Sequence, residues 1–153
     1  MAGRDFIGYP TGKVLAVFDS PTDADRAARS LEELRTAPRL RLAPEDIERF
    51  AGIDDADRFD ATGARHGPIA KALRAMQFSL MDQLPAIAWY EAALREGRTV
   101  IAVRTRSRAE TLAVVEALRG AGGHFINRFG RLDTEEFARW RGTEPAVSSL
   151  MKH

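Results

Sequence analysis

The sequence predicts an α+β fold in which one strand–helix–strand unit occurs twice within a single domain of 153 residues. The first unit spans residues 13–42 and the second spans residues 98–130. The apolar run VLAVF at 14–18 matches VIAVR at 100–104, and the residues that follow align after a one-residue offset in the first turn. Residues 43–97 form a long insertion of helical character, and residues 131–153 are expected to add a short helix and a tail.

The composition allows one core and gives no bulk charge that identifies a partner. Hydrophobic residues make up 44% of the chain, which is enough to fill one core at this length. The 23 basic and 22 acidic side chains give a net charge of +1, so we expect neither nucleic acid nor a membrane as a partner. The absence of cysteine excludes disulfides and thiolate chemistry, and the first residues lack the apolar run of a signal peptide, so we expect a cytoplasmic protein.

The first unit opens with a strand and a well-marked helix. Residues 14–18 are apolar on both alternating faces, which is typical of a strand covered on both sides. Ser20 can cap the helix that follows, and Pro21 suits its first position. Pro38 ends that helix, and residues 39–42 are predicted to form a short strand. The apolar stripe of the helix consists of Ala24, Ala27, Ala28, Leu31 and Leu34.

The insertion is predicted to contain helices. A short helix beginning at Pro44 would point Ile47 and Phe50 inward and end at Gly52. Residues 68–96 are the most apolar part, and Pro85 must break or kink the helix there. We interpret the apolar residues of this segment as core, and we expect at least one aromatic side chain, Trp89, to be buried. The alternative interpretation is a ligand pocket. The residues that would line that pocket are Met76, Leu80, Trp89 and Tyr90.

The second unit repeats the first. Ser107 and Glu110 have the spacing of a capping box at the start of a helix that glycines end at 120–123. Residues 124–129 form the last predicted strand, and Asp133 with Glu136 is expected to start a short helix that carries Phe137 and Trp140. The inward face of the long helix is predicted to carry Leu112, Val115 and Leu118.

Two such units in one small sheet predict a ferredoxin-like arrangement, with the first strands of both units adjacent and parallel in the centre. Both repeated helices would then pack on one face of the sheet. Because the central strands are apolar on both faces, the other face must be covered by the inserted helices or by a second subunit. The apolar content of the inserted segment favours a homodimer.

Residue patterns for known chemistry are missing from the sequence. The strand 99–105 lacks the aromatic residues on which an RNA-recognition domain stacks bases, and the first turn is acidic where an acylphosphatase holds phosphate. His66, His124 and His153 do not pair at metal-ligand spacing, although the sequence leaves open whether His66 and His124 meet in space. We therefore expect no catalytic residue, no metal and no cofactor.

Three arginines, Arg104, Arg106 and Arg108, lead into the Ser107-capped helix and suggest an anion site. A parallel pair of first strands would bring the turn after the first strand beside them. That turn carries Asp19, Asp23 and Asp25, which would pair with the arginines and leave little positive potential. The pattern therefore favours surface ion pairs over anion binding.

Residues 89–97, the strand 99–103 and the helix end at 118–121 resemble the heat-induced general stress proteins of the YflT-like type. The resemblance covers residues 84–130 and, more loosely, 13–42. It implies a small cytoplasmic, stress-associated protein without catalysis or cofactor. The sequence as a whole predicts a non-catalytic domain that acts by self-association or by binding a protein partner; the alternative is a ligand sensor or enzyme with its pocket between the sheet and the inserted helices.

Overall fold

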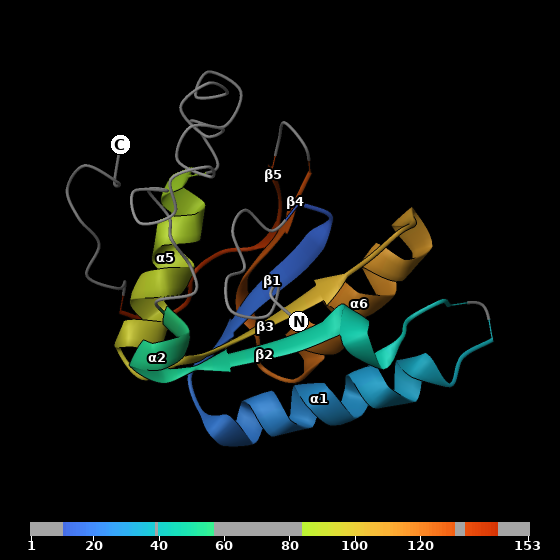
Figure 1. Cartoon of the computed structure of the whole chain (residues 1–153), viewed down its shortest axis with the longest axis horizontal. Helices are drawn as coiled ribbons and strands as arrows, with labels where there is room; N and C mark the ends of the chain where they lie inside the picture. Colours follow the sequence, from blue (N-terminus) through green and yellow to red (C-terminus); the bar gives the residue numbers. More distant parts are fainter. Residues whose placement is uncertain (1–10, 39, 57–83, 131–133, 144–153) are drawn as a thin grey trace.

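The computed structural model describes residues 11–38, 40–56, 84–130 and 134–143. They form an α+β fold with a five-stranded antiparallel sheet in the order β2-β3-β1-β4-β5, and helices lie on both of its faces (Figure 1). The elements follow one another as β1 (Lys13–Phe18), α1 (Pro21–Arg35), the 3-10 turn η2 (Pro44–Asp46), β2 (Ile47–Ala51), α2 (Gly52–Ala56), α5 (Leu84–Arg95), β3 (Thr99–Arg104), α6 (Arg108–Gly120), β4 (His124–Phe129) and β5 (Thr134–Ala138).

The first face of the sheet packs against α1 and α6, as expected for the repeated helices. Ser20 caps α1 by accepting the amide of Asp23 at 3.2 Å, and Pro21 occupies the first turn. Leu112 does not face inward as predicted, because its side chain is 47% exposed. The buried residues on this face include Val14, Ala16, Phe18, Ala24, Ala27, Leu31, Ile101, Val103, Val114, Val115 and Leu118.

The second face is covered by helices of the same chain, which is one of the two covers that the sequence allowed. Leu15, Val17, Val100 and Ala102 point to this face because alternate residues of a strand face opposite sides. Phe50 of β2 points to the same face, and over it lie Ala56, Ala88, Tyr90, Ala93 and Leu94 from α2 and α5. Pro85 lies in the first turn of α5, where proline does not remove a helical hydrogen bond.

The edge strand of the first unit is not at 39–42 as predicted. Residues 40–43 form no strand, and β2 pairs instead with β3 in antiparallel register, with Phe50 opposite Val100. Ile47 and Phe50 stand three residues apart, which places them on one face of a helix but on opposite faces of a strand. Here Ile47 packs with the cluster under α1 and α6, and Phe50 packs with the cluster under α5. A sheet covered on both sides accommodates that spacing.

The predicted helix after residue 130 is also a strand. Within the described residues β5 pairs with β4 along its length, with Thr134 opposite Phe129. Phe137 packs against the cluster on the first face, while Trp140, three residues later, packs against the cluster on the second. Asp133 lies outside the described residues.

The centre of the sheet is antiparallel, which corrects the predicted parallel pairing. β1 and β3 align with Lys13 opposite Arg104 and Phe18 opposite Thr99. The turn after β1 and the turn after β3 therefore lie at opposite ends of the sheet. This geometry changes the charges that surround the arginines before α6.

Candidate functional site

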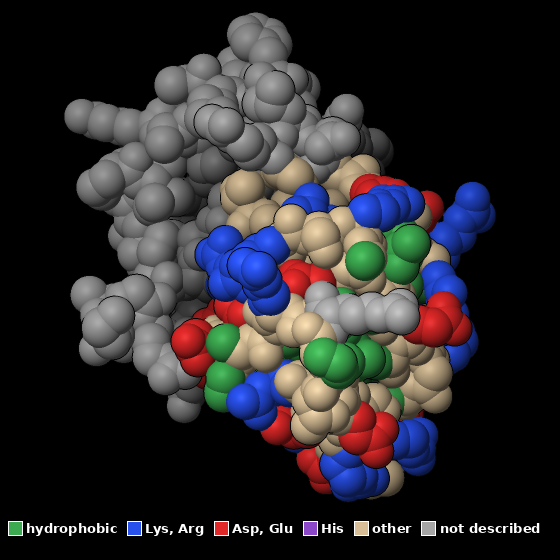
Figure 2. Space-filling model, turned by 90° about the vertical axis from the view of Figure 1, so that its right-hand side faces the viewer, with side chains coloured by type: hydrophobic (Ala, Val, Ile, Leu, Met, Phe, Trp, Pro, Cys, Tyr) green, Lys and Arg blue, Asp and Glu red, His purple; other side chains and the backbone are tan. Residues whose placement is uncertain are grey.

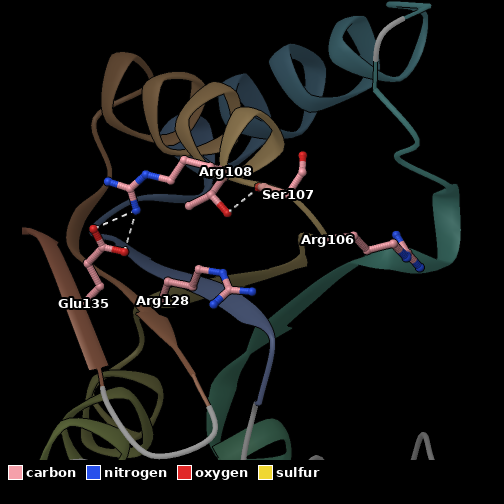
Figure 3. Close-up of a pocket in the computed structure, with 6 residues that line it drawn as sticks. Arg106, Ser107, Arg108, Arg128 and Glu135 are labelled. Atoms are coloured by element: carbon pink, nitrogen blue, oxygen red, sulfur yellow. Dashed lines mark hydrogen bonds and ion pairs between the residues drawn. The ribbon is translucent and has the colours of Figure 1, made fainter.

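A cleft of about 240 Å³ opens at the amino-terminal end of α6 (Figure 3). One wall comes from the turn between β3 and α6 and from the first turn of α6, and the rest comes from β4 and β5. The lining residues are Arg106, Ser107, Arg108, Thr111, Arg128 and Glu135. Arg106 and Arg108 are two of the three arginines for which the sequence disfavoured an anion site, whereas Arg104 is exposed at the end of β3 and is not a lining residue.

The helical wall of the cleft is held by short hydrogen bonds. The hydroxyl of Ser107 caps α6 by accepting the amide of Glu110 at 3.1 Å. Thr111 is buried and its hydroxyl donates to the Ser107 carbonyl at 3.0 Å. The same hydroxyl lies 2.8 Å from that of Thr105. These contacts fix the position of the helix start relative to the end of β3.

The capping box predicted for Glu110 does not form. Its carboxylate accepts the amide of Arg106 at 2.9 Å and that of Arg41 at 2.8 Å, instead of reaching back to the amide of Ser107. The side chain is buried, so these charge-assisted hydrogen bonds tie the turn before α6 to the segment that precedes β2. Glu110 therefore has a role in positioning Arg106.

Two of the cleft arginines are engaged by carboxylates. Arg106 binds both oxygens of Asp46 at 2.9 Å, and these hydrogen bonds, opposed by burial, lower the pKa of Asp46. Arg108 binds both oxygens of Glu135, at 2.7 and 2.8 Å. In Figure 3 the guanidinium of Arg106 is turned away from the Arg108–Glu135 pair.

Arg128 is different, because no carboxylate lies within ion-pair distance of it among the described residues. Its Nε donates to the hydroxyl of Thr105 at 3.2 Å, and Nη2 donates to the Thr105 carbonyl at 3.4 Å. These two bonds aim the guanidinium at the cleft (Figure 3). Arg128 and Glu135 were not found from the sequence, since only the pairing of β4 with β1 and β5 brings them beside α6.

The aspartates expected to neutralise the arginines are engaged elsewhere. Asp19 contacts Arg98 and His124, at 3.1 and 2.8 Å. Asp23 and Asp25 form their ion pairs with Arg26 and Arg49, respectively. The predicted pairing across the two turns is therefore wrong, because the antiparallel centre separates the turns.

The surface around this end of the molecule is mixed in charge. Figure 2, which shows the molecule from the right-hand side of Figure 1, has Lys and Arg side chains in separate groups with Asp and Glu among them. This agrees with a net charge of +1. Any attraction for an anion is therefore local to the cleft and not a property of a whole face.

Of the four residues predicted to line the alternative pocket, the structure describes Trp89 and Tyr90. Tyr90 is fully buried, so at least one of Trp89 and Tyr90 is buried as expected. Burial raises the pKa of the Tyr90 phenol well above its usual range. Trp89 is only partly buried, against prediction, and stacks on Phe125 with ring centroids 5.3 Å apart. Met76 and Leu80 lie outside the described residues.

His124 is a buried structural residue that binds Asp19 through Nε2 and accepts the amide of Arg141 through Nδ1. His66 and His153 lie outside the described residues. In the described ranges, no group of three or more His, Asp and Glu side chains could hold a metal ion. No helix of those ranges has both the length and the apolar character needed to cross a membrane.

Comparisons with protein-family models, with curated proteins and with solved structures found no match to this chain. The resemblance to heat-induced general stress proteins therefore stays a prediction.

Proposed function

We propose that this protein is a non-catalytic binding domain that holds an anionic group, a phosphate or a carboxylate, of its ligand or protein partner in the cleft at the start of α6. The observation that carries the proposal is Arg128, whose guanidinium lines the cleft without a carboxylate partner among the described residues. A guanidinium offers donors in a planar fork that matches both anions. Ser107 also lines the cleft, from the turn before α6.

The neighbouring ion pairs support binding more than catalysis. The Arg108 guanidinium is held by Glu135, so it is oriented before a ligand arrives, and the cleft's one carboxylate is already engaged. The same pairs reduce the net positive charge. We therefore expect affinity that is modest and that falls as salt is added.

Replacing Arg128 with methionine is expected to weaken pyrophosphate binding about tenfold or more, because one charge-assisted hydrogen bond is worth about 1.5–3 kcal/mol. Isothermal titration calorimetry at low salt measures this. Arg139→Met is the matched control, since Arg139 is exposed and lies outside the cleft lining. Equal affinities for the wild type and Arg128→Met would contradict the proposal.

Replacing Glu135 with glutamine is expected to tighten pyrophosphate binding about fivefold, because it removes a negative charge and frees Arg108. The size follows from Coulomb attraction, since two unit charges near 4 Å in water interact by about 1 kcal/mol. Both partners are exposed, so the pair contributes only about 0.2–1 kcal/mol to stability and folding should be unaffected. Glu136→Gln, one residue along β5 and outside the lining, is the control. Unchanged or weaker binding by Glu135→Gln would count against the assigned role of Arg108.

We also propose a ferredoxin-like fold relationship, a homodimer and a cytoplasmic role in stress adaptation. A ferredoxin-like relationship is supported by the order β2-β3-β1-β4, with α1 and α6 on one face and β5 as an added edge.

Self-association as a homodimer is supported by the apolar content of the insertion, and static light scattering should give twice the chain mass. A monomer across micromolar concentrations would reject the homodimer. A cytoplasmic role in stress adaptation rests on the family resemblance alone.

A further inference from the structure

His124 joins three segments through its two ring nitrogens. Nε2 lies 2.8 Å from Oδ1 of Asp19 in the turn after β1, and Nδ1 accepts the backbone amide of Arg141 at 3.1 Å. The ring also packs edge to face on Trp140, with centroids 4.7 Å apart. Because a backbone amide only donates, Nδ1 must be an unprotonated acceptor, and the hydrogen-bond pattern assigns the single ring proton to Nε2, facing Asp19.

A second proton on this ring would preserve one contact and break the other. The Nε2 proton would still face the Asp19 carboxylate, as an ion pair. A proton on Nδ1 would face the Arg141 amide, so two donors would meet and that hydrogen bond would be lost. The Arg141 guanidinium, which donates to the carbonyl of Gly122 at 2.8 Å, adds repulsion from a second positive charge.

The charged groups around the ring favour the neutral form near neutral pH. Burial lowers the pKa of His124; Asp19 opposes this shift, and the positive charges of Arg141 and Arg98 add to it. Burial raises the pKa of Asp19, but hydrogen bonds from His124 and Arg98 outweigh burial and lower that pKa. The Asp19 carboxylate therefore stays charged. On the helix side, Asp23 faces Gly122 and is held by an ion pair of its own.

We propose that protonation of His124 releases residues 140–141 from β4, so that this contact is a pH-sensitive latch on the segment after β5. The strand itself stays paired, since the Phe125 amide donates to the Arg139 carbonyl at 2.9 Å. Release would uncover the rings that Trp140 covers, namely Trp89 and Phe125, whose centroids lie 5.6 and 5.7 Å from its own. The latch is independent of anion binding in the cleft.

The direction of the pH effect follows from the lowered pKa of His124. The folded state binds the proton less readily than the unfolded chain, in which a histidine has a pKa of about 6.5. The contact therefore contributes its full stability above about pH 6.5 and loses it as the pH falls through the lower pKa of the folded state.

Nuclear magnetic resonance of the full, ¹⁵N-labelled chain from about pH 7.5 to about pH 4.5 tests the latch. At neutral pH the ring of His124 should show its proton on Nε2. The Arg141 amide and the Trp140 indole should then shift with the midpoint of His124, below about pH 6.5, while far-ultraviolet circular dichroism stays constant. A neutral ring protonated on Nδ1, or an Arg141 amide that does not move while His124 gains its proton, would overturn the proposal.

Two variants separate the latch from a general effect of acid. The Asp19→Asn variant removes the charge that favours the protonated ring, so its midpoint should fall to lower pH; an unchanged or higher midpoint would refute the mechanism. Acid release of Trp140 should also change the fluorescence of the two tryptophans, Trp89 and Trp140, whose rings lie against each other. In the His124→Gln variant this acid-induced change should vanish. His153→Gln is the control and should keep the transition. If His124→Gln does not fold, the midpoint of Asp19→Asn decides.

Discussion

Replacing Tyr90 with phenylalanine is expected to lower the free energy of unfolding by about 1–3 kcal/mol, because buried polar groups lose their partner. The phenol oxygen lies 3.0 Å from the Leu15 carbonyl and 2.5 Å from the Phe125 carbonyl, and it accepts the side-chain amide of Asn127 at 3.0 Å. These groups belong to β1 and β4 at an irregularity in their pairing, between Leu15 and Val17. Phe125 has a φ of +48°, which residues other than glycine seldom adopt.

Urea denaturation of Tyr90→Phe, Asn127→Leu and the double variant measures this effect. The two single variants together should lose more free energy of unfolding than the double variant does, because each single change leaves the other side chain without a partner. Losses that simply add would show that the Tyr90 hydroxyl does not stabilise Asn127. We infer that this contact from α5 holds the irregular part of the sheet in place.

Replacing Gly123 with alanine is expected to destabilise the fold by about 1–3 kcal/mol through overpacking. An added Cβ would lie 2.7 Å from the backbone oxygen of Leu118 and 2.9 Å from Cζ of Phe18. The oxygen accepts the amide of Gly123 at 2.9 Å, so the end of α6 and the start of β4 would have to separate.

Gly120→Ala is the matched control for that change. An added Cβ at Gly120 meets nothing within 4 Å, and the residue is helical. Alanine should therefore stabilise this position by about 0.5–1 kcal/mol. Thermal or urea denaturation of both variants should give opposite signs, and a neutral Gly123→Ala would contradict the close packing at the end of α6.

The sequence predicted most of the elements that local patterns encode. The strands at 14–18 and 99–104, and the helices capped by Ser20 and Ser107, are confirmed because their apolar pattern and their caps lie within a few neighbouring residues. Two errors share one physical cause. Ile47 with Phe50, and Phe137 with Trp140, have helical spacing, but a sheet buried on both faces takes up the same spacing by placing one residue on each side.

The candidate site was predictable only where it is contiguous in the chain. Arg106, Ser107 and Arg108 follow one another, and their position before a helix indicated an anion site. The aspartates after the first strand would lie beside these arginines only if the two central strands were parallel, which local patterns do not test. The antiparallel centre places them at the other end of the sheet. Arg128 and Glu135 depend on the register of β4 and β5, which tertiary contacts set.

An NMR titration of the full chain with inorganic phosphate tests the central claim, that the cleft at the start of α6 binds an anion. The account predicts saturable shifts confined to the amides of Ser107 and Arg108 and to the Nε–H of Arg128, all of which surround the cleft. These shifts should shrink as sodium chloride is added, because salt screens the charge of the guanidinium group. Shifts that do not saturate, or that arise away from the cleft with Arg128 unaffected, would contradict it.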